Sequence, residues 1–222
     1  MATPGTDGRV ALVTGASGAL GAAVARVLDH RGYRLALHYT SGEDRARKAA
    51  AELSGPSTLV RADVADWAAT RDMVDRVRAE LGGISVLAVN LIGTFHTCRA
   101  ALPDMLRGRW GRIINVVSPA GLLGSRGQTA YSAAKAGVLG MTRSLALECG
   151  RFNVTVNALS PGLMATALTE ELPAEVSATL VARTAFGRMG TPDEVARGIE
   201  LLLDADYMTG QVLSIDGGMS IS

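Results

Sequence analysis

The sequence is poor in residues that mark several large classes of protein. It has only 2 cysteines in 222 residues, Cys98 and Cys149, which cannot form a disulfide framework, so we expect a reducing, cytoplasmic location. Its net charge of +1, from 22 basic and 21 acidic side chains, gives no reason to expect nucleic acid or an anionic membrane as a partner. Charged residues make up only 19% and hydrophobic residues 48%, which excludes bulk disorder. The length suits one large domain with a sizeable core, and we expect no metal site.

A long apolar run is also missing from the start of the chain. The uncharged stretch of residues 10–25 is shorter than the roughly 18 residues that a membrane-spanning helix needs. It is interrupted by small and polar residues, namely Thr14, Gly15, Ser17, Gly18 and Gly21. The stretch therefore predicts a buried strand, a glycine-rich turn and a helix, not a signal peptide.

Lysine is nearly absent, because 20 of the basic residues are arginine and only Lys48 and Lys135 are lysine. A bias this strong indicates coding composition. It still draws attention to the two lysines that remain, because arginine cannot replace lysine where a compact, titratable charge is required. Glycine is abundant by comparison, with 26 residues against a usual share of about 7%.

Short apolar runs alternate with helical patterns along the whole chain. Strands are expected at residues 10–13, 34–38, 59–60, 84–87, 113–117, 154–157 and 212–214, and helices at about 19–29, 43–53, 66–81, 91–107, 129–148 and 191–203. This alternation predicts an α/β fold: a single doubly wound (Rossmann-type) domain over residues 1–222, with a seven-stranded parallel sheet and helices on both faces. Residues 163–190 form the longest segment outside this pattern, and we expect them to be a substrate lid.

The first strand is followed by the glycine-rich turn Thr14-Gly-Ala-Ser-Gly-Ala-Leu-Gly21. Such a turn lets the backbone approach a pyrophosphate, whose charge then meets the amides of the next helix. The glycine spacing is not G-x-G-x-x-G, so a tight turn without a ligand stays open as an alternative. After the second strand, where a ribose-binding acid would be expected, the chain has His38-Tyr-Thr-Ser41 and no carboxylate before Glu43. Hydroxyl groups and Arg45 would suit a 2′-phosphate, which favours NADPH over NADH.

Tyr131 and Lys135 lie four residues apart, on one face of a predicted helix. A free phenol has a pKa near 10, and a neighbouring ammonium favours the phenolate, so the pair is suited to proton transfer near neutral pH. Lowering a phenol pKa by about three units needs roughly 4 kcal/mol of differential stabilisation. Ser118 follows the fifth strand, at the edge of the sheet where such folds place their sites. A buried tyrosine with a surface lysine is the alternative, and the scarcity of lysine favours the catalytic interpretation.

With these elements in order, the sequence resembles the short-chain dehydrogenase/reductase family over essentially its whole length. The turn resembles that family's T-G-x-x-x-G-x-G motif, except that Ala19 stands where the middle glycine is expected. The resemblance implies that Tyr131 donates a proton to the developing alkoxide, that Lys135 lowers the phenol pKa and holds the nicotinamide ribose, and that Ser118 binds the same oxygen. It implies that Asn90 positions a water that relays protons to Lys135. The cofactor residues that it implies are Gly15, Ala16, Ser17, Gly18, Leu20, Thr40, Ser41, Asp63, Val64, Tyr131, Lys135, Pro161, Gly162, Met164 and Thr166.

Within the family, the sequence is most similar to the 3-oxoacyl-[acyl-carrier-protein] reductase group. The similarity lies in residues 112–115, 130–137, 187–190 and 215–219. It implies a ketone substrate bound to an acyl carrier protein, docking through Arg112 and Arg151, and a homotetramer built on the helices near 91–107 and 129–149. A polyketide ketoreductase, a general carbonyl or secondary-alcohol oxidoreductase, and a non-catalytic nucleotide-binding protein are the alternatives.

The junction between the fourth strand and the following helix is unusually short. Relatives carry an Asn-Asn-Ala-Gly loop there, whereas here residues 84–90 run directly into Leu91-Ile-Gly-Thr-Phe95, which resembles the middle of the family's helix. We expect that roughly 25 to 30 residues are missing between Leu87 and Ala88, because a crossover between parallel strands needs at least a dozen residues. A true deletion is the alternative.

Overall fold

The structure is a computed structural model that describes residues 8–90 and 93–221. Its centre is one parallel sheet of seven strands in the order β3-β2-β1-β4-β5-β6-β7. The strands are β1 (Val10–Val13), β2 (Arg34–Tyr39), β3 (Ser57–Arg61), β4 (Ile84–Asn90), β5 (Gly111–Val116), β6 (Val154–Pro161) and β7 (Val212–Ile215). The predicted α/β doubly wound fold is confirmed. The order in which successive strands join the sheet reverses between β1 and β4, which are parallel neighbours, and this switch point opens a crevice at the carboxyl ends of the strands.

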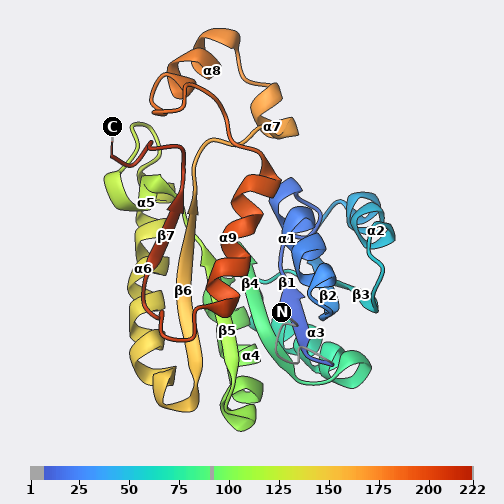
Figure 1. The fold of residues 1–222 in the computed structure, drawn as a ribbon. Helices are drawn as coiled ribbons and strands as arrows, with labels where there is room; N and C mark the ends of the chain where they lie inside the picture. Colours follow the sequence, from blue (N-terminus) through green and yellow to red (C-terminus); the bar gives the residue numbers. More distant parts are fainter. Residues whose placement is uncertain (1–7, 91–92, 222) are drawn as a thin grey trace.

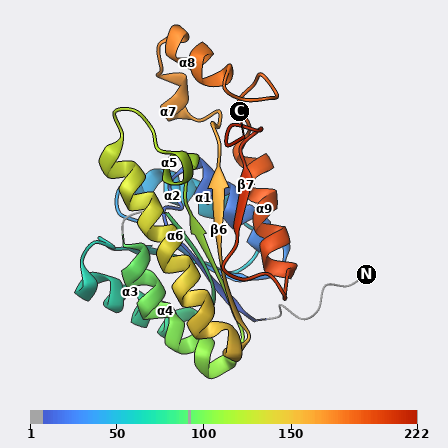
Figure 2. The ribbon, with the colours of Figure 1, turned by 90° about the vertical axis from the view of Figure 1, so that its left-hand side faces the viewer.

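Helices cover both faces of the sheet, as the alternating pattern predicted (Figures 1 and 2). The long helices are α1 (Ala19–His30), α2 (Glu43–Ala51), α3 (Trp67–Leu81), α4 (Thr94–Gly108), α6 (Thr129–Cys149) and α9 (Pro192–Asp204). One apolar core joins α1 and α9 to the sheet, and a second joins α3, α4 and α6 to the opposite face. Both cysteines lie in the second core, unbridged. Among the described residues, no helix is long and apolar enough to cross a membrane.

Capping residues fix where several of these helices begin. Asp66 accepts hydrogen bonds from the amides of Ala68 and Ala69 at the start of α3. Thr191 and Glu194 form the predicted capping box of α9, with Pro192 at its first position. These local signals explain why both helices start within one residue of the predicted position.

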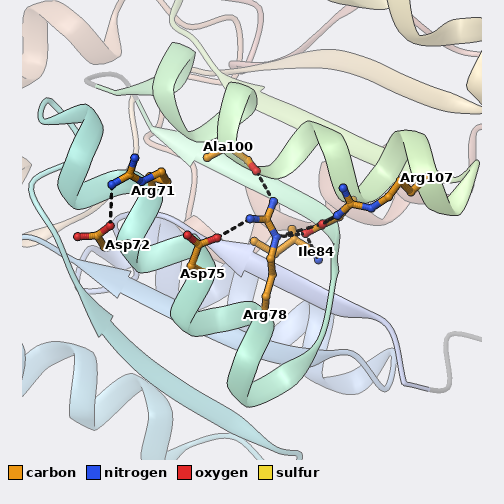
Figure 3. Close-up of polar contacts among 8 residues, drawn as sticks. Arg71, Asp72, Asp75, Arg78, Ile84, Ala100 and Arg107 are labelled. Atoms are coloured by element: carbon orange, nitrogen blue, oxygen red, sulfur yellow. Dashed lines mark hydrogen bonds and ion pairs between the residues drawn. The ribbon is translucent and has the colours of Figure 1, made fainter.

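An ion-pair cluster ties α3 to α4 and to the start of β4 (Figure 3). Asp104, whose side chain is 5% exposed, accepts hydrogen bonds from Arg78 at 2.9 Å and from the Ile84 amide at 3.1 Å, and it also pairs with Arg107. Arg78 reaches further to Asp75 and to the carbonyl of Ala100. The cluster fixes α4 along the sheet, next to α3.

Leu87 and Ala88 are consecutive residues of β4, paired with Leu12 and Val13 on one side. The connection from β4 to β5 runs over residues 91–110 and contains α4, so it exceeds the dozen residues that a parallel crossover needs. These residues are therefore enough for a crossover, contrary to the expectation from the sequence. The segment proposed between Leu87 and Ala88 stays a prediction that depends on comparison with relatives.

The expected lid has structure of its own. It carries the short helix α7 (Ala167–Glu170) and α8 (Ala174–Val181), which lie beyond the carboxyl end of β6 (Figure 1). An isolated bridge between Met164 and Gly190 closes its base, with hydrogen bonds of 2.8 Å from the Ala165 amide to Gly190 and 2.9 Å from the Gly190 amide to Leu163. The two ends of the lid are thus held together beside β6.

Candidate active site

Two adjoining cavities lie at the carboxyl edge of the sheet, and Tyr131 borders both. The first, of about 550 Å³, is lined by Thr14, Gly15, Ser17, His38, Thr40, Ser41, Asp63, Val64, Tyr131 and Lys135. The second, of about 470 Å³, is bordered by the segment 163–190, and its wall includes Ser118, Tyr131, Pro161, Gly162, Met164, Thr166 and Leu180. The structure thus brings together, around one tyrosine, predicted residues that are spread over 150 positions of the chain.

The glycine turn packs tightly onto the start of α1. Gly15 has a φ of +69°, and a Cβ on Gly21 would lie only 2.3 Å from the Gly15 carbonyl oxygen. Both positions therefore require glycine. Gly18 is the N-cap of α1 and provides no side-chain cap, and the first turn of α1 contains no acidic residue. Ala16 is buried in the turn, whereas Ala19, at the departure from the family motif, is exposed. Such an uncapped amino terminus suits the pyrophosphate of a dinucleotide.

The end of β2 presents hydroxyl groups to the first cavity, and a guanidinium of α2 lies beside the glycine turn. Thr40 and Ser41 are exposed there. Arg45 lies over Gly42 and donates a hydrogen bond of 3.2 Å from Nε to the Ser17 carbonyl in the glycine turn. The nearest acid, Glu43, is paired with Arg47, which together with Tyr39 lowers the pKa of its carboxyl group. Its charge is therefore already compensated.

Asp63 and Val64 follow β3 and close the far side of the first cavity. The Asp63 carboxylate accepts a hydrogen bond of 2.9 Å from the Ala65 amide. The Val64 carbonyl lies 3.0 Å from Nδ1 of His96 in α4. The loop after β3 is thus held by its own turn and by the start of α4.

Ser118, Tyr131 and Lys135 meet between the two cavities. Ser118 follows β5 as the N-cap of the short helix α5 (Pro119–Leu123), and its Oγ accepts a hydrogen bond of 3.3 Å from the Ala120 amide. Lys135 is 1% exposed and donates a hydrogen bond of 2.8 Å from Nζ to the Val116 carbonyl. Its Nζ lies 5.7 Å from the centre of the Tyr131 ring. Burial lowers the pKa of Lys135 to about 8.

Gly121, which the sequence did not single out, lies where α5 packs on Lys135 of α6. A Cβ on Gly121 would lie 2.7 Å from Cβ of Lys135 and 2.9 Å from its carbonyl carbon. Only glycine therefore lets α5 pack so closely on α6. Its signal in the sequence was weak, a glycine three residues after a candidate catalytic serine.

Asn90 is the last residue of β4, and its backbone pairs with Val116 of β5. Val116 is the residue whose carbonyl binds Lys135, so the Asn90 backbone lies one strand away from the lysine site. The family motif that Asn90 matches is helical, whereas here the helix begins only at Thr94.

The prediction that Arg112 docks a carrier protein is wrong. Arg112 is 1% exposed, and its guanidinium donates to the Leu203 carbonyl and pairs with Asp206. It lies near the amino end of β5, stacked on Trp110. Arg151 is exposed in the 3-10 turn after α6, and it flanks the ring of Phe152 together with Arg109. Only Arg151 of the two remains a candidate for docking.

Comparisons with known proteins agree with this architecture. Residues 9–90 match the family model described as short chain dehydrogenase, and residues 84–220 match one described as enoyl-(acyl carrier protein) reductase. The chain belongs to the short-chain dehydrogenase/reductase family. It is therefore an oxidoreductase of the class that interconverts CH–OH and C=O groups.

Several curated relatives cover nearly the whole chain. Nodulation protein G of Rhizobium meliloti (strain 1021) is 37% identical over 240 residues, which is 96% of this chain and 98% of the relative. A 3-oxoacyl-[acyl-carrier-protein] reductase of Bos taurus is 34% identical over 238 residues, 96% of this chain and 99% of the relative. A (2S)-[(R)-hydroxy(phenyl)methyl]succinyl-CoA dehydrogenase subunit of Thauera aromatica is 35% identical over 246 residues, 98% of each chain.

The alignments with these relatives have more positions than the number of residues of this chain that they include. The one with nodulation protein G has 240 positions, whereas 96% of 222 residues is about 213, so about 27 positions hold residues of the relative only. The two family models also meet at residues 84–90, where one ends and the other begins. Relative to nodulation protein G, this chain thus lacks about 27 of the aligned residues.

Proposed function

We propose that this protein uses NADPH to reduce a ketone to a secondary alcohol, and that the ketone is a 3-oxoacyl thioester carried by an acyl carrier protein. The observation that carries the proposal is the position of Tyr131, with Ser118 and Lys135 beside it, between a cavity at the glycine turn and a cavity under the lid. A dinucleotide in the first cavity and a carbonyl compound in the second would meet at the tyrosine.

The residues of the first cavity fit a dinucleotide. The uncapped start of α1 would hold its pyrophosphate, and Asp63 and Val64 would border its adenine. Pro161, Gly162, Met164 and Thr166 line the second cavity next to Tyr131, where they would hold the nicotinamide end. When bound, NADPH supplies the hydride that reduces the carbonyl carbon.

The side chains of this protein would donate the proton and bind the carbonyl oxygen of the substrate. Tyr131 would donate the proton of its phenol to the alkoxide oxygen. The Ser118 hydroxyl already accepts from the Ala120 amide, so its own proton can bond the same oxygen. Lys135 is charged at neutral pH, because its pKa of about 8 lies above 7, and its ammonium favours the phenolate that Tyr131 becomes.

The test is a reduction assay with acetoacetyl-acyl-carrier protein, acetoacetyl-CoA and a simple ketone, each with NADPH. The proposal predicts the highest kcat/KM for the carrier-bound thioester. A preference for the CoA thioester or the simple ketone would favour a general carbonyl or secondary-alcohol oxidoreductase instead. Failure to reduce any of the three would contradict the reductase proposal.

The preference for NADPH is supported by the charge at the end of β2. Arg45 lies over Gly42 and binds the Ser17 carbonyl, and among the residues that the structure describes no carboxylate pairs with it. Glu43, the acid that could repel a 2′-phosphate, is neutralised by Arg47. The site therefore offers an adenosine 2′-phosphate donors and one positive charge.

Carrier docking through Arg151 requires more than one subunit. Arg151 follows α6, whose 21 residues span about 31 Å at 1.5 Å per residue, whereas Tyr131 lies at the beginning of that helix. We propose that Arg151 and Arg109 of one protomer receive the acidic carrier for the site of a neighbour in a homotetramer. The double variant Arg151→Ala and Arg109→Ala should raise KM for the carrier-bound substrate and leave KM for the CoA thioester unchanged.

We also propose that a segment of about 27 residues is missing between Leu87 and Ala88. The alignments support this number, and the meeting point of the two family models supports the place. Inserting the corresponding segment of a relative between Leu87 and Ala88 should raise kcat at least tenfold over the 222-residue chain. An unchanged kcat would indicate that this chain works with its deletion.

A further inference from the structure

His38 is a buried histidine at the carboxyl end of β2 that the proposed reaction does not use. Its side chain is 2% exposed, and it borders the first cavity between the glycine turn and the end of β3. Its backbone also takes part, because the Ala16 amide donates a hydrogen bond of 2.9 Å to the His38 carbonyl. The residue therefore touches the turn through both main chain and side chain.

The two ring contacts define the protonation state of His38. Nε2 lies 3.0 Å from the Ala62 carbonyl oxygen, which can only accept, so Nε2 carries the proton. Nδ1 lies 3.4 Å from the Gly15 amide, which can only donate, so Nδ1 carries none. The contacts thus select one neutral tautomer of the ring.

A second proton on this ring would break the contact with the turn. If Nδ1 were protonated, it and the Gly15 N–H would both be hydrogen-bond donors and could not bond each other. Gly15 is the residue whose positive φ starts the turn. The charged groups that face the ring are Asp63 from the loop after β3 and Lys135, with Tyr131, from α6 across the cavity. Burial lowers the pKa of His38, while the hydrogen bond to Ala62 and the charge of Asp63 oppose this shift.

We propose that His38 is a positioning residue for the dinucleotide: its neutral ring holds the Gly15 amide and so fixes the glycine turn, and its protonation releases the turn. The proposal rests on dinucleotide binding at this turn. It makes cofactor affinity depend on pH through a side chain that need not touch the cofactor.

The sign of the effect follows from proton linkage. A histidine whose pKa is lowered in the folded protein contributes stability above about pH 6.5, and that contribution is lost as the pH falls through the lowered pKa. Dinucleotide affinity should fall over the same range. A ring that instead contacted phosphate as a cation would strengthen binding as the pH falls.

NADP⁺ binding, measured by calorimetry between pH 7.5 and 5.5, tests this with two variants. His38→Asn keeps an acceptor near the position of Nδ1 and cannot be protonated, so it should bind within about threefold of wild type at pH 7.5 and lose less affinity at pH 5.5. His38→Leu has no acceptor, and its affinity should be about tenfold lower at pH 7.5. Because the ligand phosphate titrates equally with all variants, the difference between wild type and His38→Asn isolates the histidine.

Imidazole NMR of the apoprotein provides a readout that needs neither cofactor nor activity. The chain has only three histidines, and His30 is exposed while His96 contacts a carbonyl through Nδ1. His38 should show the Nε2–H tautomer at neutral pH and titrate below 6.5, with the Gly15 amide shifting in step. An Nδ1–H tautomer, identical pH profiles for wild type and His38→Asn, or stronger binding at pH 5.5 in wild type alone would each overturn the proposal. If NADP⁺ binds nowhere on the protein while the NMR result holds, the proposed cofactor fails and the role of His38 in the turn survives.

Discussion

Replacing Gly121 with alanine tests whether the close packing of α5 on α6 positions the catalytic serine. The new Cβ would lie 2.7 Å from Cβ of Lys135, whereas carbon atoms in contact normally stay about 3.5 to 4.0 Å apart. The two helices must therefore separate by about 1 Å. Overpacking of this kind costs about 1 to 3 kcal/mol, and a displacement of about 1 Å at a reacting group can lower the rate about 100-fold.

Gly108→Ala is the matched control, because nothing lies within 4 Å of a Cβ at that position at the end of α4. Urea unfolding should show Gly121→Ala destabilised by about 1 to 3 kcal/mol, and Gly108→Ala unchanged or slightly stabilised. With NADPH and an acetoacetyl thioester, only Gly121→Ala should lose kcat, and its affinity for NADP⁺ should stay near that of wild type. A Gly121→Ala variant with wild-type stability and kcat would show that the position of Ser118 does not depend on this contact.

Three further predictions concern charged groups. Arg45→Gln should lower the ratio of kcat/KM for NADPH to kcat/KM for NADH by about tenfold, which is about 1.4 kcal/mol. The control Arg47→Gln should leave this ratio unchanged, and equal ratios in the two variants would show that Arg45 does not bind the 2′-phosphate. Because burial lowers the pKa of Lys135 to about 8, kcat/KM for reduction should fall as the pH rises above about 8, and a flat profile to pH 9.5 would contradict the role of its charge. Asp104→Ala should destabilise the protein by about 2 to 3 kcal/mol in urea unfolding, since it leaves Arg78 and the Ile84 amide without their buried acceptor, and a loss below about 0.5 kcal/mol would show that the cluster contributes little.

Features set by local sequence could be predicted, and features set by packing between distant residues could not. The capping box at Thr191 and the four-residue spacing of Tyr131 and Lys135 depend only on neighbouring residues, so the pattern was enough. The burial of Arg112 depends on Asp206, which lies 94 positions later in the chain. A signal for that burial existed, because Arg112 directly precedes the apolar run of β5, and a central parallel strand is covered on both faces.

The same distinction applies to the candidate site. The strand ends that supply Thr40, Asp63 and Ser118 follow from the parallel order of the sheet, so their meeting at one edge could be predicted. Gly121 contacts Lys135, and His38 contacts Gly15. No spacing in the sequence predicts either contact. Only the three-dimensional structure brings these pairs together.

Tyr131→Phe is the sharpest test of Tyr131 as the proton donor, because it removes one hydroxyl group from the boundary of the two cavities. The measurement is kcat for NADPH-dependent reduction of an acetoacetyl thioester, with NADP⁺ affinity measured on the same preparation. If Tyr131 donates the proton, kcat should fall at least about 100-fold, the range of one general acid, while NADP⁺ affinity changes less than about twofold. A variant that keeps more than about a tenth of the wild-type rate, a loss below about 1.4 kcal/mol in transition-state stabilisation, would contradict the assignment of Tyr131 as the proton donor.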